Sequence, residues 1–459
     1  MLTRKFRLET RIERSAAEVY AWHGRPGAFA RLQPPWEKVE LPDGHPGIFE
    51  SSRVTVRTKI GPFYSQWVVE HRDVIPGIQF RDVMLEGPFA QWIHTHRFVT
   101  QGDCACLLID EIEYALPLAP LGNLCGDWIV RRKLNRMFRY RHVITKHDLE
   151  RENHGVQKGP RRILVSGASG MIGSALVPFL QTQGHQVLRL VRRQSTRPGE
   201  IFWRPETGEL DDRALGKIDA VVHLAGSNVA AGRWTANRRR TILDSRVQST
   251  RTLVAALERL VAPPAVFVCA SAVGYYGNRD TAKLTEKETV GGGFLAGVSE
   301  QWERESDQAQ SRRGIRVVQL RIGVVLAAAG GALGKMLPVF RCGLGGRLAT
   351  GRQIMSWIAL EDLLSVIDFA LTNPEVKGPI NTVSPLAVTN GEFTNALGKV
   401  LGRPTVLPVP QFVLRLIFGQ MADETLLAST WAIPKRLTDL KFKFRLPIID
   451  AALRETLGS

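Results

Sequence analysis

The stretch of sequence that most constrains the fold reads RRILVSGASGMIGSALVPFLQTQGHQVLRLVRR. Its apolar run Ile163–Val165 predicts a buried strand, and Gln186–Val191 is predicted as a second strand. Between them, Gly167, Gly170 and Gly173 have G-x-x-G-x-x-G spacing at the point where a helix begins. Such glycines permit a tight turn, close approach of the backbone to a pyrophosphate, and close packing of helix on strand. Because the helix N-terminus also offers free amides to phosphate, the stretch predicts a dinucleotide-binding site.

Further alternation of strands and helices follows. The segments DAVVHLAG (219–226), AVFVCAS (265–271) and IRVVQLRIG (315–323) are typical of buried strands, and 235–260 is typical of a long helix. Strands that alternate with helices predict an α/β Rossmann-type, doubly wound parallel sheet. Ligands of such sheets bind beyond the carboxyl ends of the strands, and Ser271 stands at one of these ends.

Residues 6–145 have a different pattern, with short strands separated by Pro and Gly. The strand candidates are SSRVTVRTK, which alternates apolar and polar residues, and SQWVVEHRD, QFRDVML, QWIHTHRFV and CACLLIDEIEYAL. The segment SAAEVYAWH predicts a short helix in which Ser15 is the N-cap and Glu18 completes a capping box. Apolar residues at helical spacing predict a long helix over 124–150. The expected assembly is an α+β domain whose curved antiparallel sheet surrounds this helix.

One predicted strand of this region places Trp92, His94, His96 and Phe98 on one face, because side chains alternate with a period of two. Two imidazoles at this spacing could hold a metal ion, but the sequence assigns no position to a third Cys, His or Asp ligand. Histidines that pack in the interior or contact a ligand are the favoured interpretation, and no metal site is predicted.

Composition excludes several classes of protein. The 459 residues are 44% hydrophobic and 23% charged, and no apolar run approaches the ~20 residues of a membrane span. The N-terminus has no apolar signal core, and the five cysteines contain no CxxC pair, so we expect a cytoplasmic chain without disulfides, structural zinc or membrane contact.

The net charge of +17 is dispersed over short clusters without interleaved aromatic residues. This dispersal favours a basic surface that attracts phosphorylated ligands over nucleic-acid binding.

Two resemblances extend these predictions. The phrases RLQPPWEKVE, GPFAQWIHTHRF and MFRYRHVITKHDL resemble the START-like (SRPBCC, helix-grip) ligand-binding superfamily over roughly residues 3–150. That resemblance implies a cavity between sheet and helix for a small apolar or amphipathic ligand, although the fold by itself specifies no chemistry.

The second resemblance covers about residues 161–459. The phrases HLAGSNVAAGRWT, DSRVQSTRTLVAAL, SAVGYYGN, MSWIALEDL and ADETLLAST resemble the atypical or extended short-chain dehydrogenase/reductase (NAD-dependent epimerase/dehydratase) superfamily. Within it they are similar to an epimerase-family branch, sometimes labelled cell-division inhibitor, that has a C-terminal domain of unknown function. The expected organisation is a helix-grip domain at 1–152, a linker at 153–160, an NAD(P)-binding Rossmann domain at 161–406, and a C-terminal segment at 407–459 that completes the substrate region.

The second resemblance also implies cofactor-binding positions. Those matching the pyrophosphate loop are Gly167, Ala168, Ser169, Gly170, Met171, Ile172 and Gly173, and those beside the ribose are Leu224, Ala225 and Gly226. An NAD-selective relative carries an acid at the end of the second strand, where this chain has Val191 followed by Arg192 and Arg193. Because guanidinium groups suit a phosphate dianion, NADP(H) is expected in preference to NAD(H).

The catalytic pattern of the superfamily is Tyr-x-x-x-Lys, in which lysine lowers the pKa of a proton-transferring tyrosine. Here the corresponding stretch is FLAGVSEQWERE, and alignment on its Glu303 puts Leu295 at the tyrosine position and Ser299 at the lysine position. The remaining candidates are Ser271, Tyr275 and Tyr276; counting from Tyr275 puts Ser271 at the family's serine position, whereas counting from Tyr276 puts Ala272 there. A tyrosine without the lysine can donate a proton but is a poor base near neutral pH, which favours reduction over oxidation.

Two function classes remain open. The first is an NADP(H)-dependent oxidoreductase or epimerase-like enzyme with a non-standard acid–base group. The second is a non-catalytic sensor that couples the redox cofactor to a small-molecule receptor. The lost pair favours the second class and the fold favours the first; the sequence does not specify the substrate or the oligomeric state.

Overall fold

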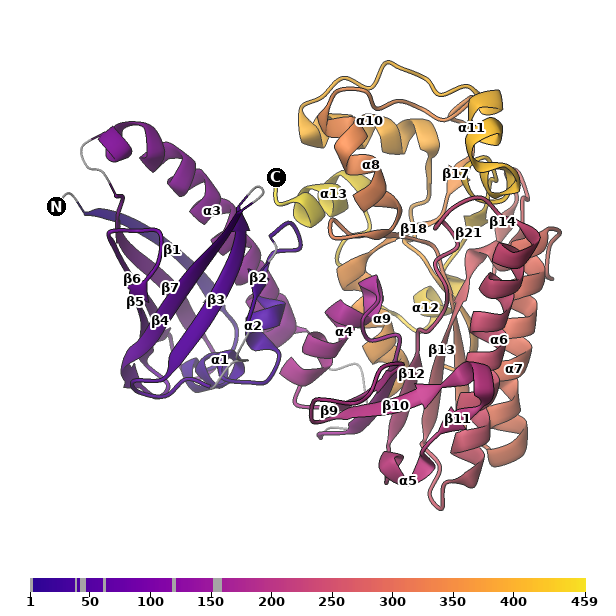
Figure 1. The fold of residues 1–459 in the computed structure, drawn as a ribbon, viewed down its shortest axis with the longest axis horizontal. Coiled ribbons are helices and arrows are strands. Elements are labelled where there is room, and N and C mark those ends of the chain that lie inside the picture. Colours follow the sequence, from indigo (N-terminus) through magenta and orange to yellow (C-terminus); the bar gives the residue numbers. More distant parts are fainter. Residues whose placement is uncertain (1–2, 38, 42–46, 61–62, 118–120, 152–158) are drawn as a thin grey trace. The chain divides into compact units, whose positions relative to one another are not determined.

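The computed structural model describes residues 3–37, 39–41, 47–60, 63–117, 121–151 and 159–459. The chain divides into two compact units, described separately below (Figure 1). Most of the predicted linker 153–160 lies outside the described residues.

The first unit is built on a seven-stranded antiparallel sheet with the order β1-β7-β6-β5-β4-β3-β2. Its strands are β1 (Arg4–Ile12), β2 (Val39–Glu40), β3 (Arg53–Ile60), β4 (Phe63–Ile75), β5 (Gln79–Glu86), β6 (Gln91–Thr100) and β7 (Cys106–Ala115). The five strand candidates from the sequence correspond to β3–β7, whereas β1 was not assigned as a strand. The alternation of charged and apolar residues in β1 matches its place at the sheet edge, where every second side chain faces outward.

Three helices accompany this sheet: α1 (Ala16–His23), α2 (Ala28–Arg31) and α3 (Leu121–Glu150). The capping box predicted for α1 is present, because the Ser15 side chain accepts from the Glu18 amide and the Glu18 carboxylate accepts from the Ser15 amide. Helix α3 crosses the sheet and packs against β1 and β7 (Figure 1). The interior contains two apolar clusters, one around Phe138 and the other around Phe80.

The second unit contains an eight-stranded sheet with the order β11-β10-β9-β8-β12-β13-β15-β19. All neighbouring pairs are parallel except β10 with β11. The strands are β8 (Arg162–Ser166), β9 (Gln186–Val191), β10 (Glu200–Arg204), β11 (Glu209–Leu210), β12 (Ala220–His223), β13 (Val266–Ala272), β15 (Arg316–Ile322) and β19 (Gly378–Thr382). The Rossmann-type α/β sheet predicted from the sequence is confirmed.

Helices cover both faces of this sheet, with α6 and α7 on one face and α4 and α9 on the other (Figure 1). Burial on both faces explains why the central strands are continuous apolar runs. The helices are α4 (Met171–Thr182), η1 (Pro205–Thr207), α5 (Asp212–Leu215), α6 (Ala236–Arg259), η2 (Val273–Tyr276), α7 (Phe294–Arg313), α8 (Gly331–Arg341), α9 (Leu360–Thr372), α10 (Asn390–Leu401), α11 (Gln411–Phe418), η3 (Ala422–Leu426), α12 (Lys435–Asp439) and α13 (Ile449–Leu457).

The C-terminal segment is built into the second unit. Three strand pairs join distant parts of the chain: β14 (Lys283–Leu284) with β21 (Trp431–Ala432), β16 (Val324–Leu326) with β18 (Trp357–Ala359), and β17 (Ile354–Met355) with β20 (Val388–Thr389). Leu453 of α13 belongs to the same apolar cluster as Leu337 of α8 and Leu397 of α10. The segment therefore completes a second core beside the sheet.

Candidate functional site

A groove of about 830 Å³ opens at the carboxyl ends of β8, β9 and β12, the edge at which ligands bind in such sheets. The sequence-predicted residues that line it are Gly167, Ala168, Ser169, Gly170, Arg192, Arg193, Leu224, Ala225 and Gly226. The other three, Met171, Ile172 and Gly173, form the first turn of α4. The structure thus brings the glycine loop and two strand ends together around one hollow.

The loop requires glycine at two positions. Gly167 has φ +70, and a Cβ atom there would lie 2.8 Å from the Leu224 carbonyl group. A Cβ atom on Gly173 would lie 2.2 Å from the Gly167 oxygen. Both contacts are with backbone, which cannot move aside as a flexible side chain can. These glycines therefore allow β8, α4 and the end of β12 to approach one another closely.

The two arginines after β9 differ in their surroundings. Arg193 donates to Glu200 Oε1 at 2.6 Å and to Thr196 Oγ1 at 3.0 Å. Arg192 is 75% exposed, and the carboxylate of Glu206 lies 3.7 Å from its guanidinium. Of the two, Arg192 is the guanidinium accessible to an incoming phosphate.

Glu200 is an acid in the groove that the sequence did not predict, because no acid stands at the end of β9. It lines the groove from β10, but its side chain is only 2% exposed and is paired with Arg193 at 2.6 Å and Arg189 at 3.6 Å. Because the Glu200 carboxylate is buried and paired with two arginines, it is not accessible as a hydrogen-bond acceptor for the ribose hydroxyls.

Helix α6 forms one wall of the groove, which the sequence analysis did not predict. Five of its polar side chains line the groove: Thr241, Asp244, Ser245, Gln248 and Ser249. They recur at i, i+3, i+4, i+7 and i+8, the spacing of one helix face. This polar stripe is the feature of the sequence that could have predicted the wall of the groove. A helix that packs only on the sheet would have apolar residues at these positions.

Ser271 stands at the end of β13, as expected, but is only 3% exposed. Its hydroxyl donates to Glu303 Oε1 at 2.6 Å. Arg321 donates to both oxygens of Glu303, from Nε at 2.9 Å and from Nη2 at 2.8 Å. The hydroxyl of Ser271, one of the catalytic candidates from the sequence, therefore belongs to a buried ion-pair network.

Tyr276 belongs to the same network. It is fully buried, its hydroxyl accepts from Arg321 Nη1 at 2.9 Å, and it donates to Asn381 Oδ1 at 2.7 Å. Burial raises the pKa of Tyr276 to about 12. Tyr275 is partly buried, and the Arg321 guanidinium lies 3.5 Å from its ring centroid. Among the described residues, none accepts a hydrogen bond from the Tyr275 hydroxyl, so Tyr275 is the less constrained of the two tyrosines.

Helix α7 carries the two positions at which the sequence analysis places the family's acid–base pair. Leu295, in its first turn, packs against the apolar cluster that contains Trp234 and Val298, and Ser299 is 3% exposed. Glu303 follows one turn later and points into the Ser271–Arg321 network. These three positions recur at i, i+4 and i+8 along α7 and carry a leucine, a serine and a paired carboxylate.

Comparison with known proteins supports the same fold. Residues 163–383 match the NAD dependent epimerase/dehydratase family, and 409–456 match a domain of unknown function, DUF1731. An epimerase family protein of Mycobacterium bovis is 45% identical over 291 residues, which cover 63% of this chain and 96% of that protein. The chain belongs to the NAD dependent epimerase/dehydratase family.

Two solved structures of epimerase-family proteins are similar to it. One, described as a nucleoside-diphosphate sugar epimerase from Corynebacterium glutamicum, is 31% identical with a TM-score of 0.80, and the match covers 99% of this chain and 90% of that one. The other, human epimerase family protein SDR39U1 with NADPH, is 34% identical with a TM-score of 0.59, covering 64% of this chain and 98% of that one.

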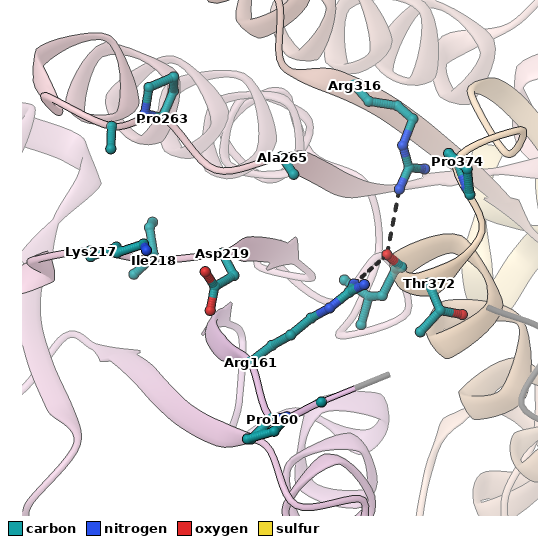
Figure 2. A pocket seen from close by; sticks show the side chains of 13 residues that line it. Pro160, Arg161, Lys217, Ile218, Asp219, Pro263, Ala265, Arg316, Thr372 and Pro374 are labelled. Carbon is teal, nitrogen blue, oxygen red and sulfur yellow. Dashed lines mark hydrogen bonds between the residues drawn. The ribbon is translucent and has the colours of Figure 1, made fainter. Parts of the chain in front are cut away.

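A second hollow in this epimerase-family chain, of about 870 Å³, lies at the opposite edge of the sheet, where β8, β12, β13 and β15 begin (Figure 2). Arg161 and Arg316 reach into it, but they donate to the carbonyl oxygens of Leu371 and Ala370 at the end of α9, at 2.6 and 2.9 Å. Because these guanidinium groups satisfy helix carbonyls, this hollow is a weaker candidate for the nucleotide than the groove.

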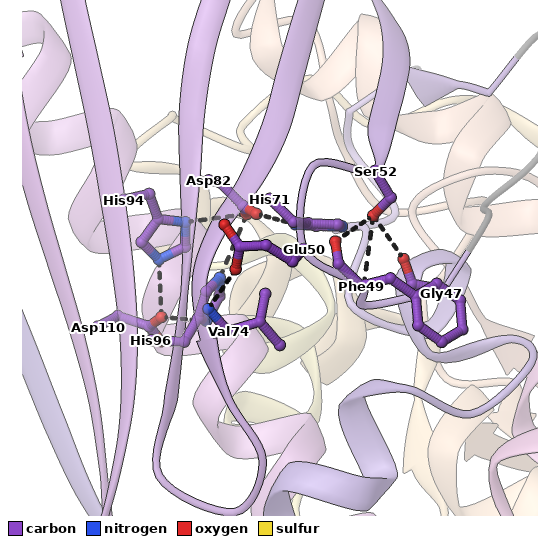
Figure 3. A network of polar contacts seen from close by, with 10 residues as sticks. All are labelled: Gly47, Phe49, Glu50, Ser52, His71, Val74, Asp82, His94, His96 and Asp110. Carbon is purple, nitrogen blue, oxygen red and sulfur yellow. Dashed lines mark hydrogen bonds and ion pairs between the residues drawn. The ribbon is translucent and has the colours of Figure 1, made fainter.

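The first unit contains a polar network between its two apolar clusters (Figure 3). The predicted inward-facing residues Trp92, His94, His96 and Phe98 are all buried. His94 and His96 lie beside two carboxylates whose positions the sequence does not predict, Asp82 and Asp110. Burial opposes ionisation of Asp82, but hydrogen bonds from His71 and His96 outweigh it and hold its pKa well below the usual range.

None of the helices in the described part of the chain is both long and apolar enough to span a bilayer.

Proposed function

We propose that this epimerase-family chain binds NADP(H) in the groove and uses it as a hydride carrier for a small carbonyl substrate. The observation that carries the proposal is the division of roles between the two arginines after β9. Arg193 is engaged by the buried Glu200, whereas Arg192 is exposed at the groove rim and can donate two charge-assisted bonds to a 2′-phosphate. The human relative whose solved structure contains NADPH supports this choice of nucleotide.

The remaining cofactor contacts follow from the groove. The amides of the glycine loop and the first turn of α4, at 167–173, would hold the pyrophosphate. Leu224, Ala225 and Gly226, after β12, would lie beside the ribose of the nicotinamide half. When bound, NADPH supplies the hydride, and the protein positions the acceptor and supplies a proton.

We further propose that the chain lacks the Tyr-x-x-x-Lys pair, with Leu295 and Ser299 at its positions on α7. Neither side chain transfers protons at these positions. Tyr276 is buried with a raised pKa, and the Ser271 hydroxyl is held by Glu303, which leaves Tyr275 as the proton donor of this edge. A protonated phenol favours reduction of a carbonyl over oxidation of an alcohol near neutral pH.

A second function is favoured by the same network. The hydroxyl of Ser271 is hydrogen-bonded to Glu303, and that of Tyr276 is hydrogen-bonded to Arg321 and Asn381. With these hydroxyls engaged, the stretch CASAVGYYGN would have a structural role at the end of β13 rather than a reactive one. A non-catalytic chain that reports cofactor binding would need no more than this.

The first unit would supply the small molecule in either case. Its antiparallel sheet with one long crossing helix is consistent with a START-like, helix-grip ligand-binding domain, and its buried polar network would contact a ligand between sheet and helix.

Deuteride transfer separates the two functions. The full chain is incubated with NADPH deuterated at C4 of the nicotinamide and with a panel of carbonyl compounds, and alcohols are analysed by mass spectrometry. We expect deuterium in one alcohol class, reduced by a factor of ~10² or more in Tyr275→Phe and little changed in the matched Tyr276→Phe variant. Wild-type protein that binds NADPH but transfers no deuterium would establish the non-catalytic function.

A further inference from the structure

The polar network of the first unit has a feature that the nucleotide groove does not explain. In the antiparallel register, His71 of β4 pairs with Asp82 of β5, and Asp82 pairs with His94 of β6. His96 lies two residues further along β6 and on the same face. Three adjacent strands thus deliver three imidazoles and a carboxylate to one place on the interior face of the sheet.

The atoms that face one another across this place have the spacing of metal ligands. Asp82 Oδ2 lies 3.8 Å from His94 Nδ1 and 3.4 Å from His96 Nε2, and one ligand atom from each residue lies within 4.8 Å of the others. Metal–ligand bonds of about 2.0–2.1 Å in a tetrahedral site place neighbouring ligand atoms about 3.3 Å apart. The Asp82–His94 distance exceeds that of a hydrogen bond, and the Asp82–His96 hydrogen bond is long, since the usual length is about 2.9 Å.

The far side of each of these three residues is held by another polar group (Figure 3). Asp82 Oδ1 lies 2.6 Å from His71 Nδ1, and His94 Nε2 lies 2.7 Å from Asp110 Oδ1. His96 Nδ1 lies 2.8 Å from the same Asp110 oxygen, although it is not aligned for a regular hydrogen bond.

Asp110 is held in turn. Its other oxygen, Oδ2, lies 2.6 Å from Nε2 of His142 on α3, and His142 Nδ1 lies 2.8 Å from Thr10 Oγ1. In a histidine that binds a metal ion, one ring nitrogen binds the ion and the other usually donates to a carboxylate. His94 is placed in this way, with Nε2 on Asp110 and Nδ1 facing Asp82 Oδ2. The two nitrogens that face Asp82 Oδ2 lie farther from it, at 3.4 and 3.8 Å, than the partners in any of these outer contacts.

We propose that Asp82, His94 and His96 bind one divalent transition-metal ion, of the Zn²⁺ or Fe²⁺ class. Two imidazoles and one carboxylate suit these ions better than Mg²⁺ or Ca²⁺, which prefer oxygen ligands throughout. Three protein ligands leave at least one coordination position for water or an oxygen atom of a small-molecule ligand. The Asp82 side chain is 21% exposed while that of His94 is 5% exposed, so the ion reaches the site from the Asp82 side.

The proposal does not depend on the nucleotide groove, which lies in the other unit. It also revises the sequence-based interpretation, in which no metal site was predicted because a third ligand could not be placed. Asp82 supplies that ligand, through a strand pairing that the sequence does not specify.

The experiment uses the untagged full chain after treatment with a chelator. Cobalt(II) is titrated while its visible d–d absorption is followed, and Zn²⁺ is then added in competition. We expect a saturating band at one Co²⁺ per chain that Zn²⁺ removes. Asp82→Asn and His96→Gln should each weaken Co²⁺ binding by tenfold or more, and Asp110→Asn should weaken it by about 10- to 100-fold as an orienting group.

His23→Gln is the matched control. His23 is also a partly enclosed histidine of this unit, its ring centroid lies 6.0 Å from that of His96, and its Nδ1 bonds to the Val19 oxygen rather than facing the site. We expect this variant to bind Co²⁺ as the wild type does.

Two measurements protect the test against variants that fail to fold. Circular dichroism identifies such variants, and the melting temperature of the wild type should rise with added Zn²⁺, because binding to the folded state stabilises it. Wild-type protein with no saturable Co²⁺ band and no Zn²⁺-dependent rise in melting temperature would overturn the proposal. Folded Asp82→Asn and His96→Gln variants that bind Co²⁺ like the wild type would overturn it equally.

Discussion

Replacement of Arg192 by alanine should remove the preference for NADP(H) while leaving the dinucleotide site in place. Its guanidinium is 75% exposed at the groove rim, with Glu206 at 3.7 Å. A hydrogen bond to a charged group contributes about 1.5–3 kcal/mol, and exposure to solvent argues for counting one such bond rather than two. At about 1.4 kcal/mol for each tenfold change, the Kd for NADPH should rise about 10- to 150-fold.

Isothermal titration calorimetry of NADPH and NADH against the wild type and the variant measures both effects. NADH has no 2′-phosphate, so its Kd should be nearly unchanged in Arg192→Ala. The matched variant is Arg193→Ala, which leaves the buried Glu200 without its nearest cation. We expect it to weaken NADPH and NADH together, because it disturbs the groove wall that both share. Equal wild-type affinities for the two nucleotides, or parallel losses in Arg192→Ala, would refute the assignment.

Three further predictions concern stability and organisation. Gly173→Ala should destabilise the second unit by at least about 1–3 kcal/mol in thermal unfolding, because its Cβ atom would meet the Gly167 oxygen at 2.2 Å; an unchanged melt would contradict the packing argument. Arg321→Met should cost about 3–5 kcal/mol in urea unfolding, because it leaves the Glu303 carboxylate without its bidentate partner, and the double change Arg321→Met/Glu303→Met should cost less than the single one. Limited proteolysis should cut first within 153–160 and leave two folded fragments; first cleavage inside either unit would contradict that organisation.

Local patterns specified the elements that depend on near neighbours. The capping box at Ser15 and Glu18 predicted the start of α1, and the strand predicted at Gln186–Val191 coincides with β9. The strand, turn and helix predicted around the glycine loop are confirmed, because all three lie within one short stretch, where steric and hydrogen-bonding rules act locally.

What the sequence did not predict depends on pairing between distant segments. The different surroundings of Arg192 and Arg193 arise from Glu200 on β10, which pairs in register with β9. Asp82 meets His94 only because β5 and β6 pair with that register. A shift of one residue would turn the carboxylate to the other face, and no local signal in either strand fixes that register.

The candidate catalytic residues illustrate the same limit. Ser271 stands at a strand end, as the apolar run before it predicts, but its hydroxyl is directed by Glu303, which lies 32 residues later on α7. The Tyr276 hydroxyl is directed by Arg321 and Asn381 of two neighbouring strands. Residue type at a strand end indicates a possible chemical role, whereas partners from other elements decide whether the group is accessible.

The central claim, that the groove at the carboxyl ends of β8, β9 and β12 is an NADP(H) site, is tested most directly by a crystal structure of the full chain soaked with NADPH. We expect the pyrophosphate on the amides of 167–173, the 2′-phosphate within ~3 Å of the Arg192 guanidinium, and Tyr275 as the polar side chain nearest C4 of the nicotinamide. NADPH bound in the hollow at the amino ends of the strands, or bound in the groove with its 2′-phosphate away from Arg192, would contradict it.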